Sequence, residues 1–416
     1  MSRREFHFIS GASSKFWAIE LKGSSFDITF GKIGTAGTTQ TKSFADGPAA
    51  QKAYEKLISE KTSKGYVEVG ASNAQQVGHG GGKPAQADSN ELNELYFATT
   101  QNVEDIGKLN TFIGMKVVDF KSLKSVKKGD CVYRIRVAGW DDEGDDESAG
   151  GFMDRLTTFL DSDAAPSAKG LVIGNWSTDG PEPIKPIIET LVSQKDRLPN
   201  LIAIFLGDIS SEENEISWIE QTDLSPLLKA FTQLQLLRVR GGTQLEFKSV
   251  KHDTLRALAV EAGGLAREVV GQICKAKLPD LEYLELWLGT EGYGGTTRIN
   301  DLQPILKGTT FPKLKYLGLR NSEIVDEIAA VIINSPVIHL LETLDLSLGT
   351  LTDEGARALL KLPRDGKLKR LDLHRHFLSN AMMKQLKSLP FTINVTQQVK
   401  PEDWGDDEMR FVAIGE

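Results

Sequence analysis

Cysteine is scarce in this sequence: among 416 residues, only Cys131 and Cys274 occur, and they lie far apart. Two such residues cannot build a disulfide scaffold or a zinc ribbon, and they fit a reducing compartment. The opening residues MSRREFHFIS hold two arginines but no apolar core like that of a signal peptide. No stretch reaches the ~18 uncharged apolar residues that a membrane-spanning helix needs. We therefore expect a cytoplasmic location.

Motifs of enzyme chemistry are also missing. There is no G-x-S-x-G elbow, H-E-x-x-H pair, dinucleotide fingerprint or paired C-x-x-C. The run GHGGGK at 78–83 fails as a phosphate loop, because Val77 stands where its first glycine belongs and Pro84 replaces Ser or Thr. His374 and His376 alternate but lack the further ligands that zinc requires. We expect no catalytic residue, no metal and no cofactor.

Acidic residues outnumber basic ones, but unevenly. The net charge of −8 combines +3 in residues 1–70, −2 in 71–97 and −9 in 98–416. Only the N-terminal part therefore has a net charge that would not repel a polyanion. The run at 141–147, six acids in seven residues, lacks the ligand spacing of a calcium-binding loop, and we interpret it as a solvated loop.

Residues 1–70 have the pattern of a small α+β domain. Phe26, Ile28 and Phe30 alternate with polar residues, which predicts a half-buried strand. A Gly/Thr segment then predicts a turn into another strand. Pro48 suits the first turn of a helix, and apolar residues follow at helical spacing until Gly65. A short strand at 66–69 ends the domain.

Three motifs in this part resemble the WGR domain. They are Phe16-Trp17, the run 30–37 (FGKIGTAG) and the run 60–66 (EKTSKGY). In DNA-break-activated ADP-ribosyltransferases this domain touches nucleic-acid ends through the Trp and Arg that name it. Phe30 and Lys32 stand at those positions here, so an aromatic ring and a positive charge remain, although lysine lacks the planar fork of arginine.

The resemblance implies a nucleic-acid interface. We expect its residues to be Phe30, Gly31, Lys32, Gly34 and Lys42. Lysines would neutralise phosphate, and the aromatic ring would stack on an end base or ribose. The alternative is that Phe30 is a core residue and the lysines are merely solvated.

Residues 71–97, rich in Gly, Ala and Gln, predict a flexible linker.

A repeat fills most of the remaining chain. Each unit has apolar residues at positions 1, 4 and 6 of a strand, as in Leu281-Leu284-Leu286. Nine units begin at 168, 201, 234, 255, 281, 314, 341, 368 and 390. Most steps lie near the roughly 20–29 residues of a leucine-rich repeat. Helical spacing between strands, as at 325–333 and 352–362, predicts one strand and one helix per unit.

The run 346–360 (LSLGTLTDEGARALL) resembles repeats of the ribonuclease-inhibitor type. The usual turn asparagine is replaced by Ser322, Gly349 and His376. The region from about 112 to 416 also resembles a bacterial family of leucine-rich-repeat proteins, through runs such as GLVIGNW and LELWLGTEGYGG. The pairing with a WGR domain is similar to that in proteins like the molybdate-metabolism regulator.

We therefore predict a WGR-like α+β domain (1–70), the linker (71–97), an N-terminal cap (98–167) and an α/β leucine-rich-repeat solenoid (168–416), a horseshoe with parallel strands on its concave face. Residues between the leucines should face that concave surface. We expect a protein partner to bind there through a mixed set of charged and aromatic residues. They are Phe205, Arg238, Arg240, Glu285, Trp287, Arg320 and Asp345, with Asp372 beside them.

The leading hypothesis is a non-catalytic adaptor, with nucleic acid or an ADP-ribose-related partner on the WGR-like domain and a protein on the solenoid. The alternative is a pure protein scaffold whose WGR-like domain has lost nucleic-acid binding. A weaker third hypothesis is an unfamiliar enzyme site near Trp287 and Tyr293, in the loop GTEGYGGTT.

Overall fold

The computed structural model describes residues 3–10, 13–33, 37–63, 66–69, 109–120, 131–137, 150–177, 182–404 and 407–415. The chain divides into two compact units, Met1–Asp88 and Ser89–Glu416. The predicted linker at 71–97 and the acidic run at 141–147 lie outside the described residues. In the part of the chain that the structure describes, no helix combines the length and apolarity needed to cross a bilayer.

The first unit is one antiparallel sheet covered by one helix. The strands have the order β4-β3-β2-β1-β5. Their bounds are β1 Arg4–Ser10, β2 Ser13–Lys22, β3 Ser25–Lys32, β4 Thr38–Ser43 and β5 Val67–Glu68, and the helix is α1 Gly47–Ser63. Asp46 starts the helix, because its Oδ1 accepts the Ala49 N–H at 2.8 Å. The predicted strand, helix and final strand are present, whereas residues 34–36 of the predicted turn lie outside the described residues.

The core of this unit lies between the sheet and α1. Phe26 and Ile28, which alternate along β3, are fully buried. The Phe26 ring meets Tyr54 of α1 edge-on at 6.5 Å between centroids. Trp17 of β2 is also buried, and its neighbours in register are Phe6 and Phe30. The apolar residues that alternate in the sequence therefore pack together in one aromatic core.

The second unit is built on a twelve-stranded sheet in the order β17 to β6. All neighbouring strands run parallel except β6 and β7. Their bounds are β6 Thr111–Phe112, β7 Met115–Asp119, β8 Cys131–Ile135, β9 Gly170–Gly174, β10 Ala203–Asp208, β11 Leu236–Arg240, β12 Ala257–Glu261, β13 Tyr283–Gly289, β14 Tyr316–Ser322, β15 Thr343–Asp345, β16 Arg370–Asp372 and β17 Thr392–Asn394. A separate hairpin follows, β18 Glu402–Trp404 and β19 Asp407–Met409.

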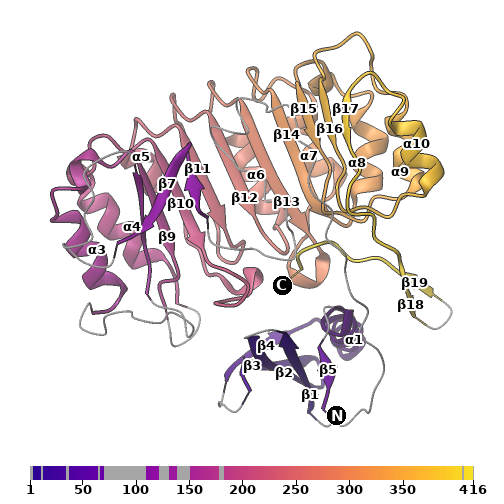
Figure 1. The fold of residues 1–416 in the computed structure, drawn as a ribbon, viewed down its shortest axis with the longest axis horizontal. Helices are drawn as coiled ribbons and strands as arrows, with labels where there is room; N and C mark the ends of the chain where they lie inside the picture. The colour runs from indigo at the N-terminus through magenta and orange to yellow at the C-terminus, as the bar shows by residue number, and fades with distance from the viewer. Residues whose placement is uncertain are drawn as a thin grey trace. The chain divides into compact units, whose positions relative to one another are not determined.

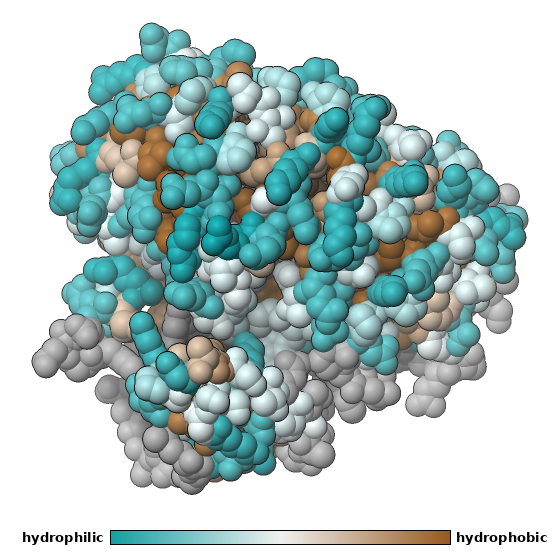
Figure 2. Space-filling view, turned by 180° about the vertical axis from the view of Figure 1, so that it is seen from behind, coloured by the Kyte–Doolittle hydropathy of each residue, from teal (hydrophilic) through white to brown (hydrophobic). Residues whose placement is uncertain are grey.

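Helices lie along one face of this sheet (Figure 1). They are α3 Phe152–Leu160, α4 Lys185–Ser193, α5 Ser225–Ala230, α6 Arg267–Lys275, α7 Ile299–Leu306, α8 Val325–Ile332, α9 Asp353–Leu359 and α10 Asn380–Leu386. Short 3-10 turns are η3 Ala165–Ser167, η4 Lys195–Arg197, η5 Ile216–Trp218, η6 Glu291–Tyr293 and η7 Pro336–His339. Hydrophilic side chains cover much of this unit in the view of Figure 2, with apolar ones between them. The architecture is that of an α/β repeat solenoid.

The apolar repeat explains the register of the sheet. Its fourth positions form one unbroken row across nine parallel strands, Leu171, Ile204, Leu237, Leu258, Leu284, Leu317, Leu344, Leu371 and Ile393. These side chains belong to a core that runs the length of the unit. On β8, Tyr133 extends the row beyond the first predicted unit. A one-residue slip of any strand would turn its leucines out of this core.

Left-handed backbone recurs two residues after the last apolar position of several strands. It occurs at Gly241, Asn321, Leu348, Arg375 and Gln397. His376 stands where such repeats usually have a turn asparagine, and its side chain accepts a hydrogen bond within the turn. Its Nδ1 accepts the Leu378 N–H at 3.1 Å. Its Nε2 lies 3.2 Å from the carbonyl of Val395. Each turn is therefore held by its own local chemistry rather than by a ladder of one residue type.

Gly37 in the first unit cannot carry a side chain without a shift. Its φ is +67°, and a Cβ would lie 2.6 Å from both Phe16 Cζ and the Phe30 carbonyl oxygen. Gly23 has the same φ but nothing within 4 Å of a Cβ. We predict that Gly23→Ala costs about 1 kcal/mol through backbone strain alone. Gly37→Ala should cost about 1–3 kcal/mol more because the loop is overpacked.

Amide hydrogen exchange of β2 and β3 in the full chain measures this difference. The Gly37→Ala chain should exchange faster there than the Gly23→Ala chain. Equal exchange in the two variants would contradict the close contact between Gly37 and Phe16.

Candidate functional site

The residues expected to bind nucleic acid lie at one end of β3 and on β4. Phe30 is half-buried and pairs in register with Trp17 and Thr38. Gly31 follows it, and Lys32 pairs with Lys15 across the sheet. The strand therefore brings an aromatic residue and two lysine positions to the same end of the sheet. Gly34 lies outside the described residues.

Lys42 lies away from that end. It is half-buried on β4 and stands opposite Phe26, four residues along β3 from Phe30. Successive residues on one face of a strand are about 7 Å apart, so Lys42 is about two such steps from Phe30. The structure thus brings Phe30, Gly31 and Lys32 together and leaves Lys42 on the neighbouring part of the sheet.

Several other charges of this unit are already paired. Arg4 donates to Glu68 through Nε and Nη2, each at 2.7 Å. The hydrogen bond from Arg4 lowers the pKa of Glu68. Lys22 donates to Asp27 at 2.6 Å and its pKa is raised by that hydrogen bond. These pairs lie on β1 and β5, at the end of β2 and at the start of β3, so they do not neutralise the far end of β3 at Lys32.

Lys61 is a residue that the sequence pattern did not single out. It is buried at the end of α1, and its Nζ lies 5.8 Å from the Trp17 ring centroid and 5.0 Å from that of Tyr66. Ammonium–aromatic contacts of this kind stabilise a buried lysine. The motif runs 16–17 and 60–66 therefore meet in the core, where they support the sheet rather than an outer surface.

The seven residues predicted to contact a protein are buried. Their exposed fractions are 3% or less, and Phe205, Arg240 and Trp287 are among the largest fully buried side chains. The sequence places them correctly between the core leucines but does not reveal that they are covered. These seven side chains are covered in the described unit, and their contact with a protein partner stays a prediction. Phe112 supplies part of the cover, with its ring 6.3 Å from that of Phe205.

Charged members of this set pair across neighbouring strands. Arg238 donates from Nε to Glu261 at 2.6 Å, and Arg240 donates to the other oxygen of Glu261 at 2.7 Å. Burial raises the pKa of Glu261, but the two guanidinium groups outweigh it and the net pKa is lowered. Further along the sheet, Arg134 donates to Asp208 at 2.8 Å. Glu261 therefore stays ionised inside the unit.

A second cluster centres on Arg320 of β14. It donates from Nη1 to Glu285 at 2.7 Å and from Nε to Ser347 at 2.9 Å, and its Nε lies 3.4 Å from Asp345. Its guanidinium lies 5.4 Å from the Trp287 ring, whose Nε1 donates to Glu285 at 2.7 Å. One arginine thus links three strands.

Two tyrosines complete this second cluster. Tyr283 and Tyr316 stack at 3.9 Å between ring centroids, with 4° between their planes. Tyr283 donates to Glu285, and Tyr316 donates to Asp345 at 2.8 Å. Burial and the adjacent carboxylates raise the pKa of both phenols well above the usual value. The two phenols thus add hydrogen bonds to the carboxylates that Arg320 also contacts.

The two histidines considered as metal ligands have separate structural partners. His374 donates from Nδ1 to Asp372 at 2.7 Å, whereas His376 binds the turn at Leu378. Although burial raises the pKa of Asp372, the hydrogen bonds from His374 and Arg370 lower it overall. Over the described ranges, no group of three His, Cys, Asp or Glu side chains is placed to hold a metal.

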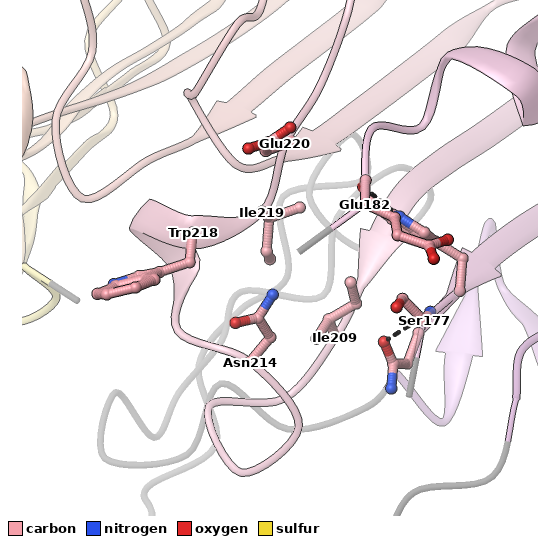
Figure 3. A pocket seen from close by; sticks show the side chains of 9 residues that line it. Ser177, Glu182, Ile209, Asn214, Trp218, Ile219 and Glu220 are labelled. Carbon is pink, nitrogen blue, oxygen red and sulfur yellow. Dashed lines mark hydrogen bonds between the residues drawn. The ribbon is translucent and has the colours of Figure 1, made fainter. Parts of the chain in front are cut away.

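The loop considered for an enzyme site is also packed. Tyr293 is 9% exposed and Trp287 is 1% exposed. A small hollow lies elsewhere, at the ends of β9 and β10, and the sequence did not mark it (Figure 3). It is lined by Asn175, Trp176, Ser177, Glu182, Ile209, Asn214, Trp218, Ile219 and Glu220. The Trp176 indole already donates to the Glu182 carbonyl at 2.8 Å.

Comparison with known proteins identifies the first unit. Residues 2–73 match the WGR domain family. The protein YehF of Escherichia coli K12 is 48% identical over 73 residues, and YfeS of the same strain is 38% identical over 66 residues. These matches cover 18% and 16% of this chain, and the chain spans 27% of the length of each relative.

One solved structure matches nearly the whole chain. It is a crystal structure of a protein from Bacteroides fragilis, 33% identical, with a TM-score of 0.59. The match covers 96% of this chain and 97% of that one. This chain belongs to the same family as the Bacteroides fragilis protein. In this chain the WGR domain is followed by the large α/β unit.

The buried charges of the repeat unit make a stability prediction. Arg320→Met leaves Glu285 and Asp345 buried without their cation, and we expect a loss of about 3–5 kcal/mol in the free energy of unfolding. Lys313→Met is the matched control, because Lys313 pairs with Asp280 at 2.6 Å but both side chains are exposed. That change should cost ~0–1 kcal/mol.

Chemical denaturation of the full chain, followed by circular dichroism, measures both variants. Arg320→Lys, which keeps the charge but not the planar fork, should fall between them. A similar small loss in Arg320→Met and Lys313→Met would show that the buried pair contributes no more than a surface pair.

Proposed function

We propose that this chain is a non-catalytic binding protein that connects nucleic acid to a protein partner. Its WGR domain contacts the nucleic acid, and its repeat unit contacts the protein. The observation that carries the nucleic-acid part is the placement of Phe30, Gly31 and Lys32 at one end of β3 in a WGR domain. A half-buried aromatic ring beside lysine positions suits stacking on a strand end combined with phosphate contact.

Charge supports the same division of roles. Residues 1–70 carry ten Lys or Arg against seven Asp or Glu, while residues 98–416 carry 38 against 47. A polyanion is attracted to the first part and repelled by the second. The proposed protein-binding role belongs to the repeat unit, but the seven buried strand residues are turned toward one another. A partner using them would first have to uncover them, so we place its contact at another part of this unit.

We predict that the full chain binds duplex DNA with blunt or nicked ends, and that Lys32→Glu weakens this binding. Lys52→Glu is the control, since it makes the same charge change at an exposed position on α1. If Lys32 contacts phosphate, its replacement should reduce the slope of log affinity against log salt by about 0.9, whereas Lys52→Glu should not.

Fluorescence anisotropy with labelled DNA and single-stranded RNA over a salt series gives these slopes. Equal weakening by both variants would indicate unspecific attraction and contradict a site at β3. Absence of binding at low salt would favour the alternative function, a protein scaffold whose WGR domain does not bind nucleic acid.

A further inference from the structure

The last described segment, residues 411–415, lies across the carboxyl ends of the strands of its own repeat unit. Figure 1 shows this yellow end of the chain running back along the sheet edge toward β13. Arg375 donates from Nη1 to the Phe411 carbonyl at 2.6 Å. The Ala413 N–H donates to the Leu348 carbonyl at 2.8 Å. Both partners belong to the recurring left-handed positions at the strand ends.

The side-chain amide of Asn321, the next left-handed position, hydrogen-bonds to both the N–H and the carbonyl of Ile414. Its Oδ1 accepts the Ile414 N–H at 2.9 Å, and its Nδ2 donates to the Ile414 carbonyl at 2.5 Å. Asn321 is fully buried, with φ +52°. Backbone strain of this kind concentrates at functional sites and must be stabilised by the surroundings. The amide hydrogen-bonds to the main chain of an extended segment, so it does not select for a particular side chain.

Two side chains of the segment are buried, those of Val412 and Ile414. Ile414 is 7% exposed and packs with Ile216, Trp287 and Leu348. The main chain then passes very close to Gly263, where a Cβ would lie 2.0 Å from the Gly415 carbonyl oxygen. The groove therefore fits an aliphatic residue, with small residues on either side, in an extended conformation.

We propose that this groove is a peptide-binding site for an extended segment of another protein, which competes with residues 411–415 of the chain itself. The partner segment has a small residue, an aliphatic residue and a glycine in succession, as in Ala413, Ile414 and Gly415. Main-chain hydrogen bonds with one side-chain pocket are the usual basis for recognising extended peptides. This inference rests on the proposed protein-binding role of the repeat unit.

The contacts of residues 411–415 show how a partner peptide could replace this segment. Four hydrogen bonds hold the segment through the main chain of three residues, and all of them are available to any extended peptide without proline at the positions of Ala413 and Ile414. An attached segment competes at a high effective concentration. The groove is thus closed until a partner displaces this segment or its anchor is weakened.

The test uses a fluorescent peptide with the sequence of residues 409–416, MRFVAIGE. It is titrated into the full chain and into the full-length Ile414→Asp variant, whose own segment loses its apolar anchor. We expect the variant to bind the peptide at least about tenfold more tightly than the unmodified chain. A peptide with Asp in place of the isoleucine should not bind.

Asn321→Gly, combined with Ile414→Asp, tests the clamp. Glycine keeps the left-handed backbone but removes the amide, so peptide binding should be lost while the unfolding temperature stays near that of Ile414→Asp. Should Ile414→Asp not fold, Ile414→Ala provides the weakened anchor. Equal peptide binding by the single and double variants, or no gain over the unmodified chain, would overturn the proposal.

Two further readings separate the remaining outcomes. Light scattering shows whether the unmodified chain is a dimer that dissociates on Ile414→Asp. Such a result would mean that the segment fills the groove of a second copy, and the intrachain competition would be wrong. DNA binding is measured on the same variants and should not change. The experiment therefore tests peptide binding at the groove separately from nucleic-acid binding by the WGR domain.

Discussion

The repeat unit depends on neutralising charge inside its own sheet. Buried arginines at 238, 240 and 320 pair with buried carboxylates at 261, 285 and 345. Moving such groups out of water costs several kcal/mol for each ion unless partners compensate. The partners come from neighbouring strands, so each pair is satisfied only in one register. Leucine rows on one sheet face and ion pairs on the other therefore specify the same alignment of strands.

This constraint also decides which parts of the molecule are left for recognition. Side chains that would suit an interface, such as Trp287 and Arg320, are bonded to Glu285 and are covered. The ends of the strands are different, because Asn321 directs its amide to the main chain of Ile414 and not to another strand of the sheet. In the WGR domain the core aromatic residues are likewise buried, and we propose the end of β3 as the place of contact with nucleic acid.

Much of the fold could be predicted, because the apolar period determines which residues of a strand share a face. The fourth-position leucines and the β3 alternation were both placed correctly. Exposure could not be predicted, because the period shows which way Arg238 or Glu285 points but not what covers it. The groove was missed for a related reason: Asn321 and Ile414 are 93 residues apart, and neither belongs to a motif. His376 was noted at the turn but without its hydrogen-bonding role.

The most direct test of the buried pairing is the free energy of unfolding of the full chain and of Glu261→Gln between pH 7 and pH 3. The pKa of Glu261 is lowered from its ordinary value of 4.5, so its contribution is fully present above that pH and is lost as the pH falls through the lower folded pKa. We predict that the unmodified chain is more stable at pH 7 and that the difference narrows progressively below about pH 4.5. A difference that does not change with pH, or a variant as stable as the unmodified chain at pH 7, would contradict an ionised Glu261 held between Arg238 and Arg240.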